Sequence, residues 1–156
     1  DLGKGATPVN AWPRHPGHGQ LGVDLIVAIC DRYRVPTACR ELATLASRYH
    51  LRIHQAEAAA PEDIVSLLES CDAFRRPDRF RQLLLVCEAD ARGCAGAADR
   101  NYTQAGFLIT CVEATGGIGA GSLVGQLQGP AIAAGIRSLR VEAVREVIAD
   151  RRPHRS

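Results

Sequence analysis

Residues 20–34 read QLGVDLIVAICDRYR, and this stretch decides the fold class. Its apolar side chains recur at steps of three and four residues, which is the spacing of one face of an amphipathic helix. No segment of the chain shows the sustained two-residue alternation between hairpin turns that a half-buried strand needs. The sequence therefore predicts an all-α fold. The residues that set the helical pattern are Leu21, Leu25, Ile26, Ile29 and Cys30.

Five more helices are expected, and proline, which suits the first helical turn, stands near the start of most of them. The predicted ranges are 36 to about 50, 61 to about 71, 77 to about 92, Asn101 or Thr103 to about 116, and about 130 through at least 147. Residues 1–19 hold four glycines and three prolines, which predicts a loop-rich start with at most one helical turn. The expected buried stripes are Leu42, Leu45, Ala46 and Tyr49; Ile64, Leu67, Leu68 and Cys71; Leu83, Leu84 and Val86; and Ile132, Ile136, Leu139, Ala143 and Val147.

Length and composition fit one domain with its own core, because the chain has 156 residues of which 46% are hydrophobic and 23% charged. We expect this domain over residues 1–150 and a short basic tail over residues 151–156. The net charge of +2 is too small to indicate a nucleic-acid partner by itself. Arginine clusters at 75, 76, 79 and 81 and at 151, 152 and 155 are therefore expected to be a solvated helix face and a frayed tail.

The six cysteines form no C-x-x-C pair and mostly fall in apolar periodic stretches, where a free cysteine behaves as a small hydrophobe. This pattern favours a reducing, cytoplasmic setting. No apolar run has the length of a membrane span, so no membrane partner is expected.

Several histidines and carboxylates together indicate a site for a divalent metal. Such ligands suit manganese, nickel, zinc, iron or magnesium, and a bound ion would activate water and polarise a phosphoryl oxygen. Taken singly, each of these residues is more often a surface or internally satisfied side chain, so the signal lies in the combination. The residues are Asp1 ahead of a Gly-Lys-Gly turn, His15 and His18 three apart, His50 and His54 four apart, and Glu88 and Asp90, which are expected to be flanked by buried residues in an otherwise apolar helix.

Read in order, these motifs resemble a known family: the C-terminal HD-type phosphohydrolase domain of the bacterial multifunctional CCA proteins, which are tRNA nucleotidyltransferases. The similarity covers nearly the whole chain. The matching stretches are DLGKGATP (1–8), PRHPGH (13–18), RVP (34–36), CR (39–40), Ala73 with RRP (75–77) and Arg79, CEAD (87–90), RG (92–93), and GP (129–130) with Ile132 and Arg140.

The resemblance implies an HD-type helical domain that hydrolyses 2′,3′-cyclic phosphates, 2′-phosphates and other phosphate esters with a divalent metal, nickel or manganese. A separate nucleotidyltransferase domain, absent here, would add or repair the CCA end of tRNA with magnesium. The expected partners are the tRNA 3′ end or 2′,3′-cyclic nucleotides, and a second copy of the chain in a homodimer. Glycine-rich residues 115–128 would be a connector or a loop facing tRNA or another domain, and not a P-loop, because they follow no strand and lack its lysine.

The resemblance also assigns roles to individual residues. Asp1 matches the aspartate of the His-Asp dyad, whose histidine would come just before it, and the absence of any methionine agrees with an incomplete start. The expected metal ligands are Asp1, His18, His50 and Asp90, with Asp1 and His50 catalytic. Lys4 and Arg14 are expected to contact substrate phosphate, because ammonium and guanidinium groups suit phosphate oxygens.

Three positions depart from the family pattern. Leu51 replaces an aspartate after His50, Gly19 replaces a glutamate after His18, and Cys94 replaces an arginine after Gly93. Loss of a supporting carboxylate costs a metal site about 10- to 100-fold in affinity or activity. Two alternatives therefore stay open: a catalytically impaired domain that serves tRNA docking or dimerisation, and a general HD-type nucleotide phosphohydrolase outside tRNA metabolism.

Overall fold

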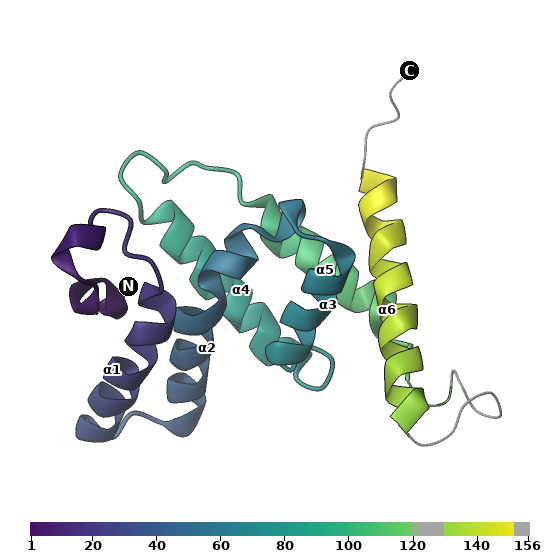
Figure 1. Cartoon of the computed structure of the whole chain (residues 1–156), viewed down its shortest axis with the longest axis horizontal. Coiled ribbons are helices and arrows are strands. Elements are labelled where there is room, and N and C mark those ends of the chain that lie inside the picture. Colours follow the sequence, from purple (N-terminus) through teal and green to yellow (C-terminus); the bar gives the residue numbers. More distant parts are fainter. Residues whose placement is uncertain (120, 122–129, 152–156) are drawn as a thin grey trace. The chain divides into compact units, whose positions relative to one another are not determined.

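The computed structural model describes residues 1–119, 121 and 130–151, and helices are the regular secondary structure within them (Figure 1). The all-α prediction is confirmed, since six α-helices and no strand occur among these residues. Short 3-10 helices, labelled η, precede α1 and follow α2. The elements are η1 (Leu2–Ala6), η2 (Val9–Ala11), α1 (His18–Arg32), α2 (Thr37–His54), η3 (Ala56–Ala58), α3 (Pro61–Ser70), α4 (Pro77–Arg92), α5 (Thr103–Thr115) and α6 (Pro130–Arg151).

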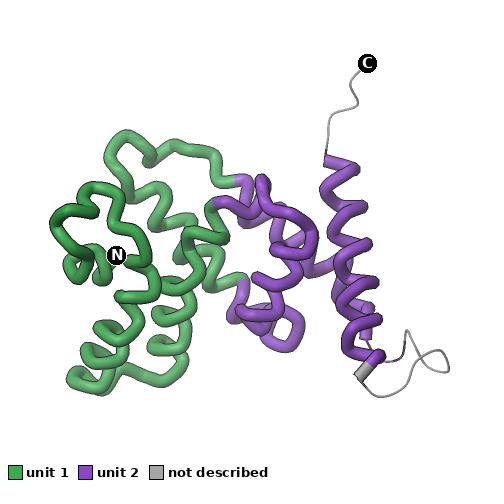
Figure 2. Tube along the Cα trace, in the orientation of Figure 1, with its two compact units in different colours: residues 1–54, 81–102 green, residues 55–80, 103–156 purple. Residues whose placement is uncertain are grey.

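The chain divides into two compact units (Figure 2). The first contains residues 1–54 and 81–102, and therefore η1, η2, α1, α2 and most of α4. The second contains residues 55–80 and 103–156, and therefore η3, α3, the first turn of α4, α5 and α6. All the sequence-predicted site residues belong to the first unit.

Glycine at three positions lets the elements of the first unit approach closely. A β-carbon on Gly3 would lie 1.9 Å from the carbonyl oxygen of His18, and one on Gly19 would lie 2.4 Å from that of Ser47. A β-carbon on Gly22 would lie 2.6 Å from the hydroxyl oxygen of Ser47. That hydroxyl donates a hydrogen bond of 2.8 Å to the carbonyl of Gly19. Helix α1 therefore packs tightly between η1 and α2, without room for side chains at these positions.

The apolar residues whose spacing predicted α1 are buried only in part. Cys30 is buried, as an amphipathic helix would have it, but Leu21, Leu25 and Ile29 are 43%, 41% and 41% exposed. The rest of the buried face contains His18, Gly19, Gly22 and Val23. A face that must approach two backbones closely needs small residues, so the larger apolar side chains of the same helix lie on another side.

The second unit packs α3 and α5 against α6, with η3 against α5. The predicted stripe of α3 is confirmed, because Ile64, Leu67, Leu68 and Cys71 are all at most 2% exposed. Ion pairs also link α6 to α3 and η3: Arg137 with Glu69, Arg145 with Glu62, and Arg151 with Glu57.

The stripe of α6 is only partly as expected. Leu139 is 39% exposed, whereas Val141 and Val144, absent from the prediction, are buried. Helix α6 also extends through Arg151, one residue into the expected tail. The rest of that tail, residues 152–156, and most of the glycine-rich segment, residues 120 and 122–129, lie outside the described residues.

Helix α4 corrects a further expectation, that residues on both sides of Glu88 and Asp90 are buried. Leu83, Leu84 and Cys87 are buried, but Leu85 and Val86 are 65% and 39% exposed. With 3.6 residues per turn, only one side of α4 can face the core, so a continuous apolar run must expose some members. Asp90 is on the exposed side of α4.

Two helix limits and the N-terminal loop differ from the prediction near the site. Helix α1 starts at His18, two residues early, and α2 continues through His54. The expected loop over residues 1–19 contains two 3-10 helices. No helix among the described residues has both the length and the apolar character to cross a membrane.

Candidate metal centre

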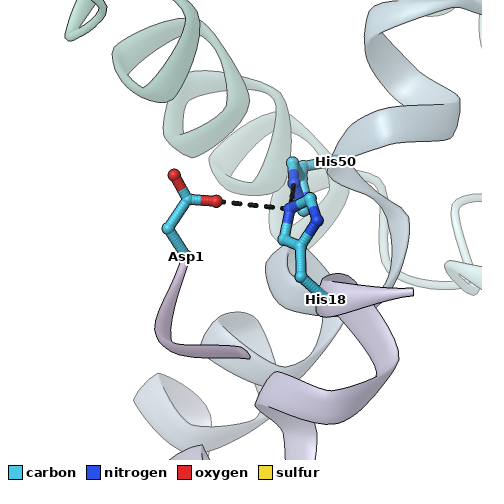
Figure 3. A group of neighbouring side chains, drawn as sticks. All are labelled: Asp1, His18 and His50. Carbon is cyan, nitrogen blue, oxygen red and sulfur yellow. Dashed lines mark hydrogen bonds and ion pairs between the residues drawn. The ribbon is translucent and has the colours of Figure 1, made fainter. Parts of the chain in front are cut away.

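Three of the predicted ligands converge from separate elements of the first unit (Figure 3). Asp1 precedes η1, His18 opens α1, and His50 lies in the last turns of α2. One ligand atom from each lies within 4.8 Å of the other two. The Nε2 atom of His18 is 3.3 Å from Asp1 Oδ1 and 3.1 Å from His50 Nε2. Both histidines are buried, whereas the Asp1 side chain is 45% exposed.

Backbone carbonyls fix which nitrogen of each ring can bind a metal. His18 Nδ1 lies 2.8 Å from the carbonyl oxygen of His15. His50 Nδ1 lies 3.0 Å from the carbonyl oxygens of both Ala46 and Ser47. A carbonyl oxygen only accepts hydrogen bonds, so each Nδ1 bears the proton and donates it. The Nε2 lone pairs of both neutral rings are therefore left as ligands.

The spacing of these nitrogens fits a shared cation. Two Nε2 lone pairs that face one another across 3.1 Å repel unless a proton or a metal ion lies between them. Nitrogen ligands about 2.1 Å from one ion and at right angles to each other are about 3.0 Å apart. Two imidazoles and a carboxylate suit zinc, nickel, manganese or iron. The residues present thus fit a divalent metal ion.

Gly19 has a structural role at this centre. The resemblance places glutamate at this position, but a β-carbon there would lie 2.4 Å from a backbone oxygen of α2. A larger residue would separate α1 from α2 and therefore His18 from His50. Glycine at 19 is the residue that permits the observed approach.

A hydrogen-bonded loop holds the carbonyl that orients His18. The hydroxyl of Thr7 donates to the carbonyl of Lys4 at 2.7 Å and lies 2.6 Å from His15 Nδ1. The indole Nε1 of Trp12 donates to the Thr7 carbonyl at 3.3 Å. These bonds fix His15 by its side chain while its backbone carbonyl faces His18. His15 is thus a supporting residue and lies outside the ligand group.

The two predicted phosphate-binding residues lie in the same unit. The Nζ atom of Lys4 pairs with Oδ2 of Asp1, the oxygen that does not face His18. Arg14 is exposed on the segment between η2 and α1. Lys4 is therefore placed at the centre through Asp1, whereas the role of Arg14 stays a prediction.

A pocket of about 300 Å³ adjoins the centre. Its walls come from η1, α1, α2 and α4, and they include Asp1, His50 and Asp90. Asp90, a predicted ligand, lies outside the three-residue group. One of its oxygens, Oδ2, lies 3.1 Å from His54 Nε2. Glu88 pairs with Arg92 at 2.8 Å. The other lining residues are Leu2, Ile26, Ala43, Ala46, Ser47 and Val86.

Sequence reasoning missed two residues beside the site, Ser47 and Tyr102. Ser47 ties α2 to α1 through Gly19, and the Tyr102 hydroxyl lies 2.9 Å from His54 Nδ1. Tyr102 is 48 residues from His54 along the chain, so no local spacing connects them.

The chain is thus an all-α domain in which two histidines and an aspartate form a candidate metal centre beside a pocket. By sequence, the chain is related to the multifunctional CCA proteins. It is 46% identical to the one from Nitrosococcus oceani over 149 residues, which is 95% of this chain and 37% of the relative. It is 43% identical to that of Hahella chejuensis over 154 residues, 98% of this chain and 36% of the relative. The match to the Cupriavidus metallidurans protein is 49% over 123 residues, 79% of this chain and 30% of the relative.

The chain therefore corresponds to one section of a multifunctional CCA protein and spans about a third of the length of these relatives. No family model matches the chain, and no solved structure matches it significantly.

Proposed function

We propose that this chain is the metal-dependent phosphohydrolase section of a CCA-adding tRNA nucleotidyltransferase. Its substrates are 2′,3′-cyclic phosphates, 2′-phosphates and related phosphate esters of nucleotides or of the tRNA 3′ end. The observation that supports this most directly is the meeting of His18 Nε2, His50 Nε2 and Asp1 Oδ1, with both imidazoles held in the ligand tautomer. The similarity to multifunctional CCA proteins supports the link to tRNA.

Asp1, His18 and His50 hold the divalent ion, nickel or manganese, and Asp90 adds a carboxylate from the pocket wall. The ion supplies water of lowered pKa and polarises a phosphoryl oxygen. Asp1 and His50 are the catalytic residues in this proposal, because both hold the ion and line the pocket. Carbonyl contacts to the histidines keep the geometry fixed before substrate enters, which lowers the cost of reaching the transition state.

Lys4 and Arg14 bind the substrate phosphate. The ion pair of Lys4 with Asp1 supports this role, because it keeps the ammonium group close to a proposed metal ligand. A cation there stabilises negative charge that builds up on the phosphoryl oxygens. Arg14 supplies a planar fork that can bind two oxygens.

The parent protein in this proposal adds CCA to tRNA through a magnesium-dependent domain outside this chain. It works in the cytoplasm and assembles as a homodimer. The CCA-adding role rests on the resemblance and on the names of the relatives, magnesium and the homodimer on the resemblance alone, and the cytoplasmic setting on the cysteine pattern.

Hydrolysis of 2′,3′-cyclic AMP by the metal-free chain, reconstituted with nickel or manganese, tests the proposal. The chain is compared with a form extended by one histidine before Asp1, which the HD pattern expects. His50→Ala and Asp90→Ala should each lower turnover by at least 10-fold, because each removes a metal ligand. Gln20→Ala, an exposed neighbour on α1, is the matched control and should keep full turnover.

A different result would favour the alternative of a non-enzymatic supporting role. If neither form binds nickel by calorimetry nor hydrolyses the substrate, the phosphohydrolase proposal is wrong. If the His50→Ala variant turns over as fast as the unaltered chain, the proposal is also wrong, because the activity does not then depend on this centre.

A further inference from the structure

Asp90 belongs to a hydrogen-bonded chain of three side chains inside the first unit. Its Oδ2 atom lies 3.1 Å from His54 Nε2, and His54 Nδ1 lies 2.9 Å from the Tyr102 hydroxyl. Asp90 lines the pocket next to the metal centre, whereas Tyr102 is only 9% exposed. The chain therefore runs from a buried phenol to a carboxylate on the pocket wall.

The direction of these hydrogen bonds follows from the chemistry of the two ends. Burial, and then the nearby Cys87, Asp90 and Glu88, raise the pKa of Tyr102 above its ordinary value, so its hydroxyl stays protonated. An ionised carboxylate can only accept hydrogen bonds. A neutral His54 then accepts from Tyr102 at Nδ1 and donates from Nε2 to Asp90. In this arrangement the Tyr102 hydroxyl selects the His54 tautomer.

The His54 ring packs against two other rings, those of His50 and Tyr102. Its ring lies edge-on to that of His50, with centroids 5.8 Å apart, and edge-on to that of Tyr102 at 5.7 Å. His54 is four residues after His50 on the same helix, so both rings lie on one face of α2. The position of His54 is thus fixed by packing, and its protonated nitrogen by Tyr102.

We propose that Tyr102 is a positioning residue for the metal centre: its hydroxyl makes His54 a donor to Asp90 Oδ2, which leaves Oδ1 of Asp90 as the oxygen available to the ion. This inference rests on the proposed function, in which Asp90 is a ligand. It adds two residues, His54 and Tyr102, that support the ligand without touching substrate. Partners that orient a ligand in this way are commonly worth 10- to 100-fold in metal affinity or activity.

The test uses Tyr102→Phe, which removes the hydroxyl but keeps the ring that packs against His54. Tyr33→Phe is the matched control, because Tyr33 is 67% exposed at the end of α1. Three quantities are measured for each variant: the tautomer of His54 by ¹⁵N NMR of the metal-free chain, nickel affinity by calorimetry, and hydrolysis of 2′,3′-cyclic AMP. Circular dichroism checks that both variants fold.

We expect Tyr102→Phe to change the His54 tautomer populations and to lower nickel affinity about 10-fold or more, with Tyr33→Phe unchanged. The double variant Tyr102→Phe with His54→Gln should recover part of the lost affinity, because the glutamine amide donates to Asp90 without help from Tyr102. Recovery also distinguishes positioning from general damage to the fold, which a second substitution would not repair.

Failure of this inference differs from failure of the proposed function. If the His54 tautomer and nickel affinity are the same in Tyr102→Phe as in the unaltered chain, the positioning role is wrong, whatever the hydrolysis assay gives. If both change while the unaltered chain hydrolyses nothing, the positioning role is supported and the phosphohydrolase proposal fails.

Discussion

His18 and His50 direct their Nε2 atoms at each other across 3.1 Å, while the Nδ1 atom of each ring donates to a backbone carbonyl. The carbonyl of His15 orients one ring, and the carbonyls of Ala46 and Ser47 orient the other. Two facing lone pairs repel, and a cation between them turns that repulsion into coordination.

Removal of either imidazole should abolish tight metal binding. His18→Ala and His50→Ala each take one of the three grouped ligands away, so nickel affinity should fall by at least 10-fold in calorimetric titrations. His15→Gln is a useful comparison, because the backbone carbonyl of His15, and not its ring, faces His18. A loss in His15→Gln as large as that in His18→Ala would argue against the assigned roles.

Alanine at position 19 should destabilise the protein. Its β-carbon would lie 2.4 Å from the carbonyl oxygen of Ser47, so α1 and α2 must separate, at a typical cost of about 1–3 kcal/mol. Gly106→Ala is the matched control on α5, where no atom lies within 4 Å of the new β-carbon. The free energy of unfolding of that control should rise by up to about 1 kcal/mol, because alanine has a higher helix propensity than glycine. Urea denaturation measures both, and equal stability of the two variants would contradict the close approach.

Metal binding should change the fluorescence of Trp12, the only tryptophan. Its ring centroid lies 5.5 Å from that of His15, whose carbonyl accepts the hydrogen bond from the ligand His18. Titration with nickel or manganese should therefore quench its emission with a one-to-one end point. His18→Ala should remove the response. Stoichiometric binding seen by calorimetry with constant emission would place the metal elsewhere.

The cysteines should differ widely in their rate of alkylation. Cys39 and Cys94 are exposed, whereas Cys111 is buried, and burial raises the pKa of its thiol to about 12. Thiolate is the reactive form, so Cys111 stays protonated and unreactive at pH 8. Iodoacetamide followed by peptide mass spectrometry should find Cys39 and Cys94 modified first. Labelling of Cys111 at the rate of Cys39 would show that α5 opens readily.

The raised pKa of Cys111 also makes the stability of the fold depend on pH. A thiol with a higher pKa in the folded than in the unfolded chain stabilises the fold below its unfolded pKa of about 9. This contribution is lost as the pH rises through about 12, because the unfolded chain releases the proton first.

The arginines after α3 allow a test of RNA contact. Arg75 and Arg76 are 81% and 51% exposed, and both lie 3.6–3.7 Å from the single carboxylate of Asp72. If they contact phosphates, Arg75→Ala with Arg76→Ala should weaken tRNA binding and lower the slope of log affinity against log salt by about 1.4–1.8. Arg32→Ala with Arg48→Ala removes the same charge from an exposed part of the first unit. If the two double variants weaken tRNA binding equally, net charge alone explains the effect, and Arg75 and Arg76 belong to a solvated helix face, as the sequence predicted.

Local pattern predicted the helices well and their buried faces less well. The stripe of α3 is as expected because ordinary helix packing buries large apolar residues, such as Ile64 and Leu68. The stripe of α1 is not, because its Gly19 and Gly22 meet backbone and a serine hydroxyl at distances that exclude side chains. Periodicity reports which residues share a face, and it does not report how closely the neighbouring element approaches.

The sequence by itself determined the all-helical architecture, the approximate helix ranges and the set of residues from which a metal site could be built. Helix starts and apolar spacing are local properties, and histidine and aspartate have their ligand chemistry wherever they lie. The resemblance named Asp1, His18, His50 and Asp90 as ligands, and tertiary structure decided which of them meet. Asp1, His18 and His50 converge, whereas Asp90 lies outside that group and contacts His54, which in turn contacts Tyr102. These residues come from segments far apart in the chain, and only the approach of α1 to α2, permitted by glycine, brings the two ligand nitrogens within reach of one ion.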